Sequence, residues 1–118
     1  MILVDTDIFI DYFREHEYAE IFFDAHVNEI CITYFTMMEL IAGAANKVQM
    51  KKIQDNLFYP VLEANSQIMQ LSVKIYIRHR LTNGTGLIDS INAASAIHHN
   101  LDFTNPVDFK KQYFKQAA

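Results

Sequence analysis

The chain has 118 residues, of which 51% are hydrophobic, and it carries a formal net charge of −4 with only three glycines and two prolines. A chain of this size and composition can bury a core of its own, so we expect one compact domain. The acidic balance argues against a protein that holds duplex nucleic acid on a broad basic surface, although nucleic acid remains open as a substrate.

The single cysteine, Cys31, has no partner for a disulfide within the chain, which excludes a disulfide framework and favours a reducing compartment. It lies in the apolar run Ile30–Ile32, where packing in the core is the simplest role. No charged segment precedes a long apolar stretch, and no apolar run approaches the ~20 residues that cross a bilayer. We therefore expect a soluble cytoplasmic protein that does not bind membranes.

A short buried strand is predicted at the start of the chain, over Ile2–Val4, and it stops abruptly at Asp5. Apolar residues then recur at a helical spacing over residues 8–13, which places Asp5 or Thr6 at the N-cap. An acid at this point either caps the helix or faces the ligand crevice that forms where parallel strands end. Both interpretations of Asp5 stand at this stage.

Two more acids follow in the same helix. Asp7 and Asp11 are four residues apart and share one helical face, where like charges repel slightly. Solvent, Arg14 or a bound cation would relieve this repulsion.

Helices and short strands are predicted to alternate along the rest of the chain. The predicted helices span Glu17–Asn28, Tyr34–Ala42, Asn46–Phe58, Ala64–Leu81, Leu87–His99 and a segment that begins at Asn105. The predicted strands span Glu29–Thr33 and Leu101–Thr104, with Tyr59–Leu62 as a strand or a connector. This alternation indicates an α/β domain whose mainly parallel sheet is covered by helices on both faces.

Glycines and prolines mark several of these boundaries. Gly43 suits a left-handed C-cap after the helix that precedes it. Pro60 disfavours helix in the residue before it, and Asn83–Gly86 separates the two long helices of the second half. Asn105 followed by Pro106 is typical of a helix start, with asparagine as the cap and proline in the first position.

Four acids lie at or near predicted junctions between a strand and a helix. They are Asp5, Glu39, Asp89 and Asp108. Each has a structural explanation, because Thr36–Glu39 matches a capping box, Asp89 complements a helix dipole and Asp108 suits a cap. Parallel strands, however, bring successive junctions to one edge of a sheet, where the four acids would converge and repel. A hard divalent cation such as Mg²⁺ resolves this repulsion, so the pattern also indicates a metal site.

Four segments carry a family resemblance that covers nearly the whole chain. They are Leu3–Asp7 with the helix that follows, Thr36–Gly43, Asp89–Ala96 after a glycine-containing loop, and Asn105–Phe109. In this order and spacing they resemble a PIN domain, and more narrowly the VapC toxins of bacterial and archaeal toxin-antitoxin pairs. The resemblance implies a single PIN domain over residues 1–118, with a three-layer fold in which helices flank a short, mainly parallel sheet.

The resemblance also implies an activity, namely a Mg²⁺- or Mn²⁺-dependent endoribonuclease that cleaves tRNA or another structured RNA with metal-activated water. Asp5, Glu39 and Asp89 match the three main acidic positions of the family. Asp5 and Asp89 would be the principal metal ligands, and Glu39 would hold a second ion or a metal-bound water. Thr6 and Asp7 would add hydrogen bonds around the ligands. The expected partners are a cognate antitoxin and a second copy of the chain in a homodimer.

One departure from the family keeps a second interpretation open. The family often has aspartate where this chain has Asn105, so the fourth acidic ligand is either missing or supplied by Asp108, one helical turn away. A catalytically weak PIN-like module that binds RNA or protein is therefore the alternative function. A third interpretation, a helical interaction protein whose acids are all caps, requires the motif match to be accidental.

Three further groups of residues have two interpretations each. Basic residues that either flank an RNA path or are simply solvated are Lys47, Lys51, Lys52, Arg78 and Arg80. Residues that either fill the core or form a dimer or antitoxin groove are Phe22, Phe23, Tyr34, Phe35, Met37 and Met38. His98 and His99 have no partner at metal-ligand spacing, and we assign them no chemistry.

Overall fold

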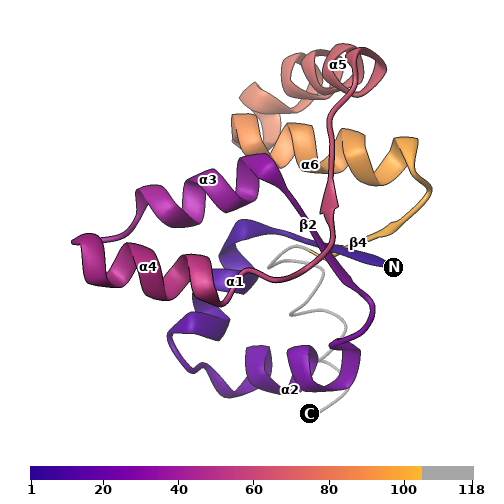
Figure 1. Cartoon of the computed structure of the whole chain (residues 1–118). Coiled ribbons are helices and arrows are strands. Elements are labelled where there is room, and N and C mark those ends of the chain that lie inside the picture. Colours follow the sequence, from indigo (N-terminus) through magenta and orange to yellow (C-terminus); the bar gives the residue numbers. More distant parts are fainter. Residues whose placement is uncertain (105–118) are drawn as a thin grey trace.

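The structure, a computed structural model, describes residues 1–104 of the chain, and within them it contains four strands and six helices (Figure 1). The strands are β1 (Ile2–Val4), β2 (Ile30–Thr33), β3 (Val61–Leu62) and β4 (Asp102–Thr104). The helices are α1 (Thr6–Phe13), α2 (Glu17–His26), α3 (Tyr34–Ala42), α4 (Lys47–Asp55), α5 (Ser66–Asn83) and α6 (Leu87–His98). The predicted α/β class is confirmed.

The four strands form one parallel sheet in the order β3-β2-β1-β4. β1 lies inside the sheet, because Ile2 is in register with Ile30 of β2 on one side and with Asp102 of β4 on the other. Since the strands are parallel, they all end at the same edge of the sheet. The residue after β1, Asp5, and the last residue of β2, Thr33, therefore lie side by side at that edge.

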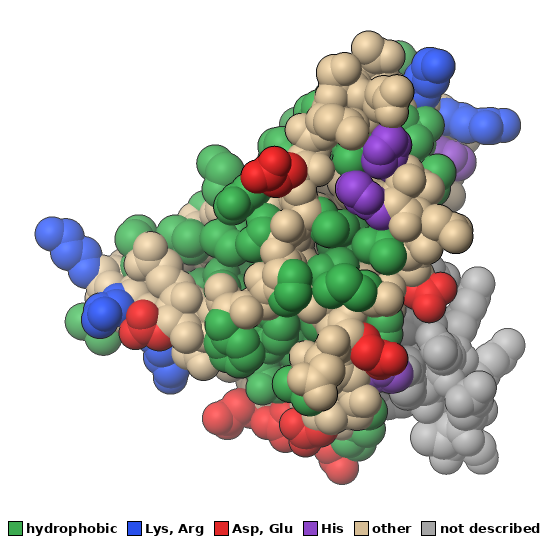
Figure 2. Space-filling model, turned by 45° about the vertical axis from the view of Figure 1, so that its right-hand side comes forward, with side chains coloured by type: hydrophobic (Ala, Val, Ile, Leu, Met, Phe, Trp, Pro, Cys, Tyr) green, Lys and Arg blue, Asp and Glu red, His purple; other side chains and the backbone are tan. Residues whose placement is uncertain are grey.

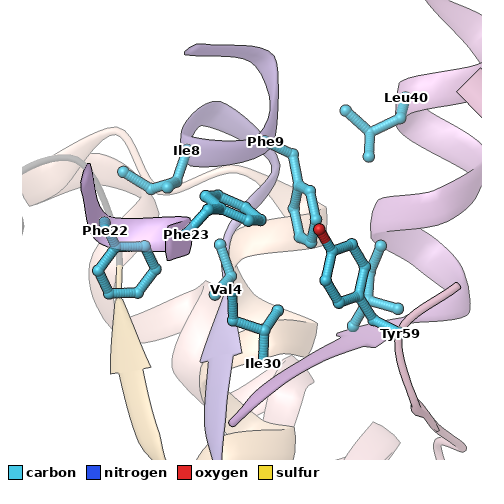
Figure 3. Packing of buried hydrophobic residues seen from close by; sticks show 9 residues of the cluster. Val4, Ile8, Phe9, Phe22, Phe23, Ile30, Leu40 and Tyr59 are labelled. Carbon is cyan, nitrogen blue, oxygen red and sulfur yellow. The ribbon is translucent and has the colours of Figure 1, made fainter. Parts of the chain in front are cut away.

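Successive side chains of each strand point to opposite faces of the sheet, and each face has its own buried cluster. On one face, Val4 packs with Phe9 of α1 and Phe22 of α2 (Figure 3). On the other face, Leu3 and Cys31 pack with side chains that include Ala96 of α6. Figure 1 accordingly shows α1 and α2 on one side of the sheet and α6, with α5 beside it, on the other.

Aromatic packing fixes the start of α1 against the sheet. The Phe9 ring makes edge contacts with the rings of Phe23 and Tyr59, at centroid distances of 5.2 and 5.5 Å (Figure 3). Burying one side chain of this size contributes about 1.5–3 kcal/mol. Because Phe9 lies one helical turn after Asp5, this packing also holds Asp5 in place at the end of β1.

The core role predicted for Cys31 is confirmed, since its side chain is fully buried in β2. Its thiol donates a hydrogen bond to the Ile2 carbonyl oxygen at 3.4 Å. Burial raises the pKa of this thiol above its usual range. The cysteine is therefore a packing residue and a poor nucleophile.

The left-handed C-cap predicted at Gly43 is wrong, because this residue has a φ of −79°. The last turn of α3 tightens instead, with the Gly43 amide donating to the Leu40 carbonyl oxygen and the Ala44 amide to the Ile41 carbonyl oxygen. These bonds satisfy the terminal carbonyls without a left-handed residue. The left-handed cap occurs at Gly84, which ends α5 with a φ of 66°.

The end of one predicted helix differs from the structure, and the start of another lies outside the described residues. α4 ends at Asp55, before the predicted Phe58, since the chain from Leu57 onward turns into the extended approach to Pro60 and β3. The helix predicted to begin at Asn105, and Asp108 with it, lies outside the described residues. Within residues 1–104, no helix is long and apolar enough to cross a membrane.

Candidate functional site

Asp5 occupies the N-cap position of α1, but its side chain makes no capping hydrogen bond. The carboxylate is instead buried, with 3% of the residue exposed, at the edge where β1 ends. Its backbone amide donates to the Thr104 carbonyl oxygen of β4 at 3.0 Å, which ties this position to the neighbouring strand. Asp5 is therefore the N-cap residue by position, as predicted, but its side chain does not supply the capping bond, and its carboxylate lies buried at the edge of the sheet.

The capping box predicted over Thr36–Glu39 is also wrong, because Thr33 is the N-cap of α3. The Thr33 hydroxyl accepts a hydrogen bond from the Thr36 amide at 3.2 Å. β2 continues in extended conformation to Thr33, so the helix begins three residues earlier than a cap at Thr36 requires. Glu39 consequently lies in the second turn of α3, with its side chain exposed to solvent.

Asp89 lies in the first turn of α6, after Gly86 at the N-cap, and it is exposed. The expectation that it follows a strand is wrong, because α5 and a short loop precede α6. A Cβ atom on Gly86 would lie 3.4 Å from the Asp89 carboxylate, so glycine leaves room for this side chain. The negative charge of Asp89 nevertheless acts on Asp5 and Asp7 and raises the pKa of both carboxyl groups.

Asn92, one turn further along α6, connects three elements at this edge. Its amide nitrogen donates to the Thr36 hydroxyl at 2.8 Å and to the Asp5 carboxylate at 3.4 Å. Its amide oxygen accepts from the Thr33 hydroxyl at 2.7 Å. We call Asp5, Thr33, Thr36 and Asn92 the Asn92 network; all four residues are buried. Through it, the start of α3 and the start of α6 are held against the end of β1.

Thr6 adds one more contact to this group. Its hydroxyl lies 3.4 Å from the Thr36 hydroxyl, and Thr6 is itself buried. Among the described residues, no buried side-chain nitrogen or oxygen atom lacks a hydrogen-bond partner. The polar edge of the sheet is thus a fully bonded support beneath the acidic side chains.

Burial is the main reason why the pKa of the Asp5 carboxyl is raised to about 7, and the charge of Asp89 is the next. A hydrogen bond from the Thr6 backbone amide opposes this rise in part. The pKa of Asp7 is also raised, first by burial and then by the charges of its acidic neighbours. These neighbours are Asp89, Glu39 and Asp11.

No lysine or arginine within residues 1–104 forms an ion pair with any of these acids. The Tyr18 hydroxyl donates a hydrogen bond to Asp11, but it brings no positive charge. The group therefore carries negative charge that the described part of the chain leaves uncompensated. A divalent cation is the partner that such a group favours.

The donors at this edge fit Mg²⁺ or Mn²⁺. Asp5 and Asp89 supply neighbouring carboxylate oxygens, which are hard ligands, and Mg²⁺ commonly binds one or two carboxylates and keeps several waters. Within residues 1–104, no three side chains of histidine, cysteine, aspartate or glutamate are grouped closely enough to hold a metal ion. Asp108, the fourth predicted acid, is not among the residues described. The structure thus brings together two carboxylates, Asp5 and Asp89, and the charges of Asp89 and Glu39 act on Asp7 beside them.

Asn92 is the residue that the sequence predictions missed, although it lies inside a segment that carries the family resemblance. A usable signal was present, because Asn92 is three residues after Asp89 and hence on the same face of its helix. Its neighbours Ile91, Ala94 and Ser95 are small or apolar. A single amide among such residues indicates a buried polar contact.

We expect Asn92→Leu, which keeps the volume of the side chain, to lower the free energy of unfolding by about 2 kcal/mol. The Thr33 and Thr36 hydroxyls would lose a buried partner, and such losses cost about 1–3 kcal/mol. Urea unfolding measures the change. Asn28→Leu, at an exposed position between α2 and β2, is the control and should change stability by less than about 0.5 kcal/mol. Equal effects of the two substitutions would contradict a stabilising role for the network.

The aromatic, basic and histidine residues singled out in the sequence lie in different environments. Phe22 and Phe23 are buried in the core, whereas Tyr34 and Met38 are 50% and 67% exposed. In Figure 2, lysine and arginine side chains stand out at the end of the molecule where α4 lies. His98 and His99 are exposed and belong to no metal-binding group among the described residues.

Comparison with known proteins gives one family and a set of solved structures. The model of the PIN domain family matches residues 2–115. A toxin-antitoxin complex from Klebsiella pneumoniae contains a chain that is 26% identical, with a TM-score of 0.74; the match covers 87% of this chain and 83% of that one. No curated protein sequence matches the chain.

Two further structures share the fold. FitAcB from Neisseria gonorrhoeae matches at 20% identity and a TM-score of 0.69, covering 89% of this chain and 86% of that one. VapBC2 from Rickettsia felis, bound to a DNA fragment from its promoter, matches at 18% identity and a TM-score of 0.70, covering 94% and 92%.

Proposed function

The chain belongs to the PIN domain family, and on that basis we propose that it is a metal-dependent endoribonuclease and the toxin of a type II toxin-antitoxin pair. PIN domains are generally nucleases. The observation that carries the proposal is the pair formed by Asp5 and Asp89, two neighbouring carboxylates without a cationic partner among residues 1–104. The likeness to a chain of the Klebsiella pneumoniae toxin-antitoxin complex supports the assignment as a toxin.

The proposed catalytic residues have distinct roles. Asp5 and Asp89 would hold Mg²⁺ or Mn²⁺, which, when bound, lowers the pKa of water and offsets the charge of the phosphate under attack. Asp5 is suited to a fixed ligand, since Asn92 and the backbone of Thr104 hold it in place. Glu39 is exposed and able to orient the attacking water, or to hold a second ion. Asp108 is proposed as the remaining acid of the site.

We propose tRNA or another structured RNA as the substrate, cut at a single-stranded position, and a single PIN domain over residues 1–118. The partners would be a cognate antitoxin and a second copy of the chain, both in the cytoplasm. The exposed side chains of Tyr34 and Met38 support a protein contact on α3. A basic antitoxin segment would complement the uncompensated acids of the site.

The test is cleavage of total tRNA by the purified protein, freed of antitoxin, with Mg²⁺ or Mn²⁺ and with chelator. We expect discrete fragments that require the metal and return when metal is added back after chelation. The carboxylates of Asp5 and Asp89 repel the negatively charged phosphate of the RNA unless a cation lies between them. Gel electrophoresis of the RNA gives the result. Fragments that persist in chelator would contradict the mechanism.

The second candidate is a PIN-like module that binds RNA or protein without cutting RNA. It is favoured by Asn105, where the family often has aspartate, and by the limited metal-ligand set among residues 1–104. Binding of RNA in chelator, together with no cleavage by a folded protein that binds Mn²⁺, would support this candidate over the nuclease.

A further inference from the structure

A pocket of about 350 Å³ lies between α1, α3 and α4, and we call it the α1–α4 pocket. Its lining includes the apolar side chains of Ile10, Phe13 and Ile53, which we call its floor. The polar side chains Gln49 and Asn56, the two cations Arg14 and Lys52, and the carboxylate of Glu39 line it as well. Pockets that bind small ligands commonly start at about 300 Å³, so this one has room for a ligand of about the size of one nucleotide.

The pocket is next to the acidic site. Glu39 of α3 lines the pocket, and both α1 and α3, which contribute to its lining, begin at the edge of the sheet, directly after Asp5 and Thr33. A ligand that runs across the acidic site therefore reaches the pocket by passing Glu39.

The two cations of the pocket are available to a ligand. Neither Arg14 nor Lys52 forms an ion pair with a residue in the described range 1–104. The preceding residue of α4, Lys51, does not line the pocket and pairs with Asp55 at 3.7 Å. In a protein with a net charge of −4, the two cations outweigh the one carboxylate that lines the pocket, Glu39, and give the pocket a local positive charge that favours an anion.

We infer that the α1–α4 pocket binds one nucleotide of the RNA substrate, beside the phosphate that is cut. The phosphate of this nucleotide lies between Arg14 and Lys52, and its base lies on the floor that contains Phe13. The inference rests on the proposed ribonuclease function and adds the place where the substrate is held.

The positive charge of the pocket favours RNA over a peptide as its ligand. The acids of the site repel the phosphates of an approaching RNA, so the strand needs a cationic anchor a short distance away. Base contact with an aromatic or apolar surface is worth about 1–3 kcal/mol and accepts any base, which suits the aromatic ring of Phe13 and its apolar neighbours in the pocket.

The test compares two charge reversals on adjacent lysines of α4, Lys52→Glu and Lys51→Glu. Affinity for a short, fluorescein-labelled single-stranded RNA is measured by anisotropy in chelator, so that no cleavage occurs. Lys52→Glu should weaken binding about tenfold and lower the slope of log affinity against log salt by about 0.7, the value for one phosphate contact on a single strand. Lys51→Glu should change the affinity by less than about twofold, because this side chain lies outside the pocket.

Equal affinities of the two variants would overturn the inference and would indicate that the pocket takes a protein segment or nothing. Crosslinking gives a second readout. An RNA that contains 5-iodouridine should crosslink to peptides of α1 or α4, and crosslinks found only on other helices would contradict the inference.

Activity separates this inference from the proposed function. If the protein cleaves RNA, Lys52→Glu should raise KM and leave kcat nearly unchanged, since the contact is made equally before and during the reaction. Cleavage with the same KM in both variants would contradict RNA binding in the pocket but would agree with the proposed nuclease function. If the protein cleaves no RNA and Lys52→Glu alone loses RNA binding, the result would support RNA binding in the pocket and contradict the proposed nuclease function.

Discussion

Asp89→Asn should lower the rate of metal-dependent RNA cleavage by about 10³-fold, which corresponds to about 4 kcal/mol of lost transition-state stabilisation. The substitution keeps the size of the side chain but removes one of the two carboxylate charges that we propose as metal ligands. Because Asp89 is exposed in the first turn of α6, the fold should tolerate the change. The measurement is the initial rate of tRNA cleavage in Mg²⁺, with circular dichroism to establish that the variant is folded.

The matched control for this experiment is Asp102→Asn. Asp102 is exposed at the beginning of β4, in register with Ile2, and so lies at the edge of the sheet opposite to the site. The same chemical change there should leave the cleavage rate within about twofold, because the carboxylate is far from the reacting phosphate. Equal activity of Asp89→Asn and the unmodified protein would contradict the assigned site, or would show that a contaminating ribonuclease makes the fragments.

Asp5→Asn should raise the free energy of unfolding of the metal-free protein at pH 8 by about 2–4 kcal/mol. The pKa of Asp5 is about 7 in the folded protein, against the ordinary value of 3.8, so the folded state binds a proton more tightly than the unfolded state. This group therefore lowers the stability of the protein as the pH rises from about 4 to about 7, and the loss is complete above pH 7. Asparagine has no such titration.

Urea unfolding in chelator at several pH values tests this prediction. The difference between Asp5→Asn and the unmodified protein should be largest at pH 8 and should disappear near pH 4. Added Mg²⁺ should reduce the difference at pH 8, because only the unmodified site gains stability from the ion. If Asp5→Asn were less stable at pH 8, the carboxylate would be stabilised in the folded protein and the charge of the site would be compensated.

The change of hydrophobic period made the first strand and helix predictable. Val4 belongs to a short apolar run, and the spacing from Ile8 onward is helical, so Asp5 falls at the junction by sequence alone. The chain thereby predicts the position of Asp5. It does not predict whether the carboxylate caps α1 or faces the site, because that depends on side chains from other elements.

The remaining features of the site depend on contacts between distant parts of the chain. Asn92 meets Asp5 across 87 positions of sequence, and only the packing of α6 against the ends of β1 and β2 decides this. The position of Asp89 also depends on this packing, because α6 follows another helix and the sequence alone does not place its start at the edge of the sheet. Both threonines, Thr33 and Thr36, suit an N-cap, and the length of β2 decides between them.

The place of β1 inside the sheet has a consequence for biosynthesis. β1 is synthesised before the other strands, yet it pairs with β4, and the Asp5 amide donates to the carbonyl oxygen of Thr104. Asp5 and Asp89 are therefore not held together until nearly all of the described chain has been translated, because a domain of this kind folds as a unit. The two carboxylates that the proposed function requires therefore come together only after β4 has been synthesised.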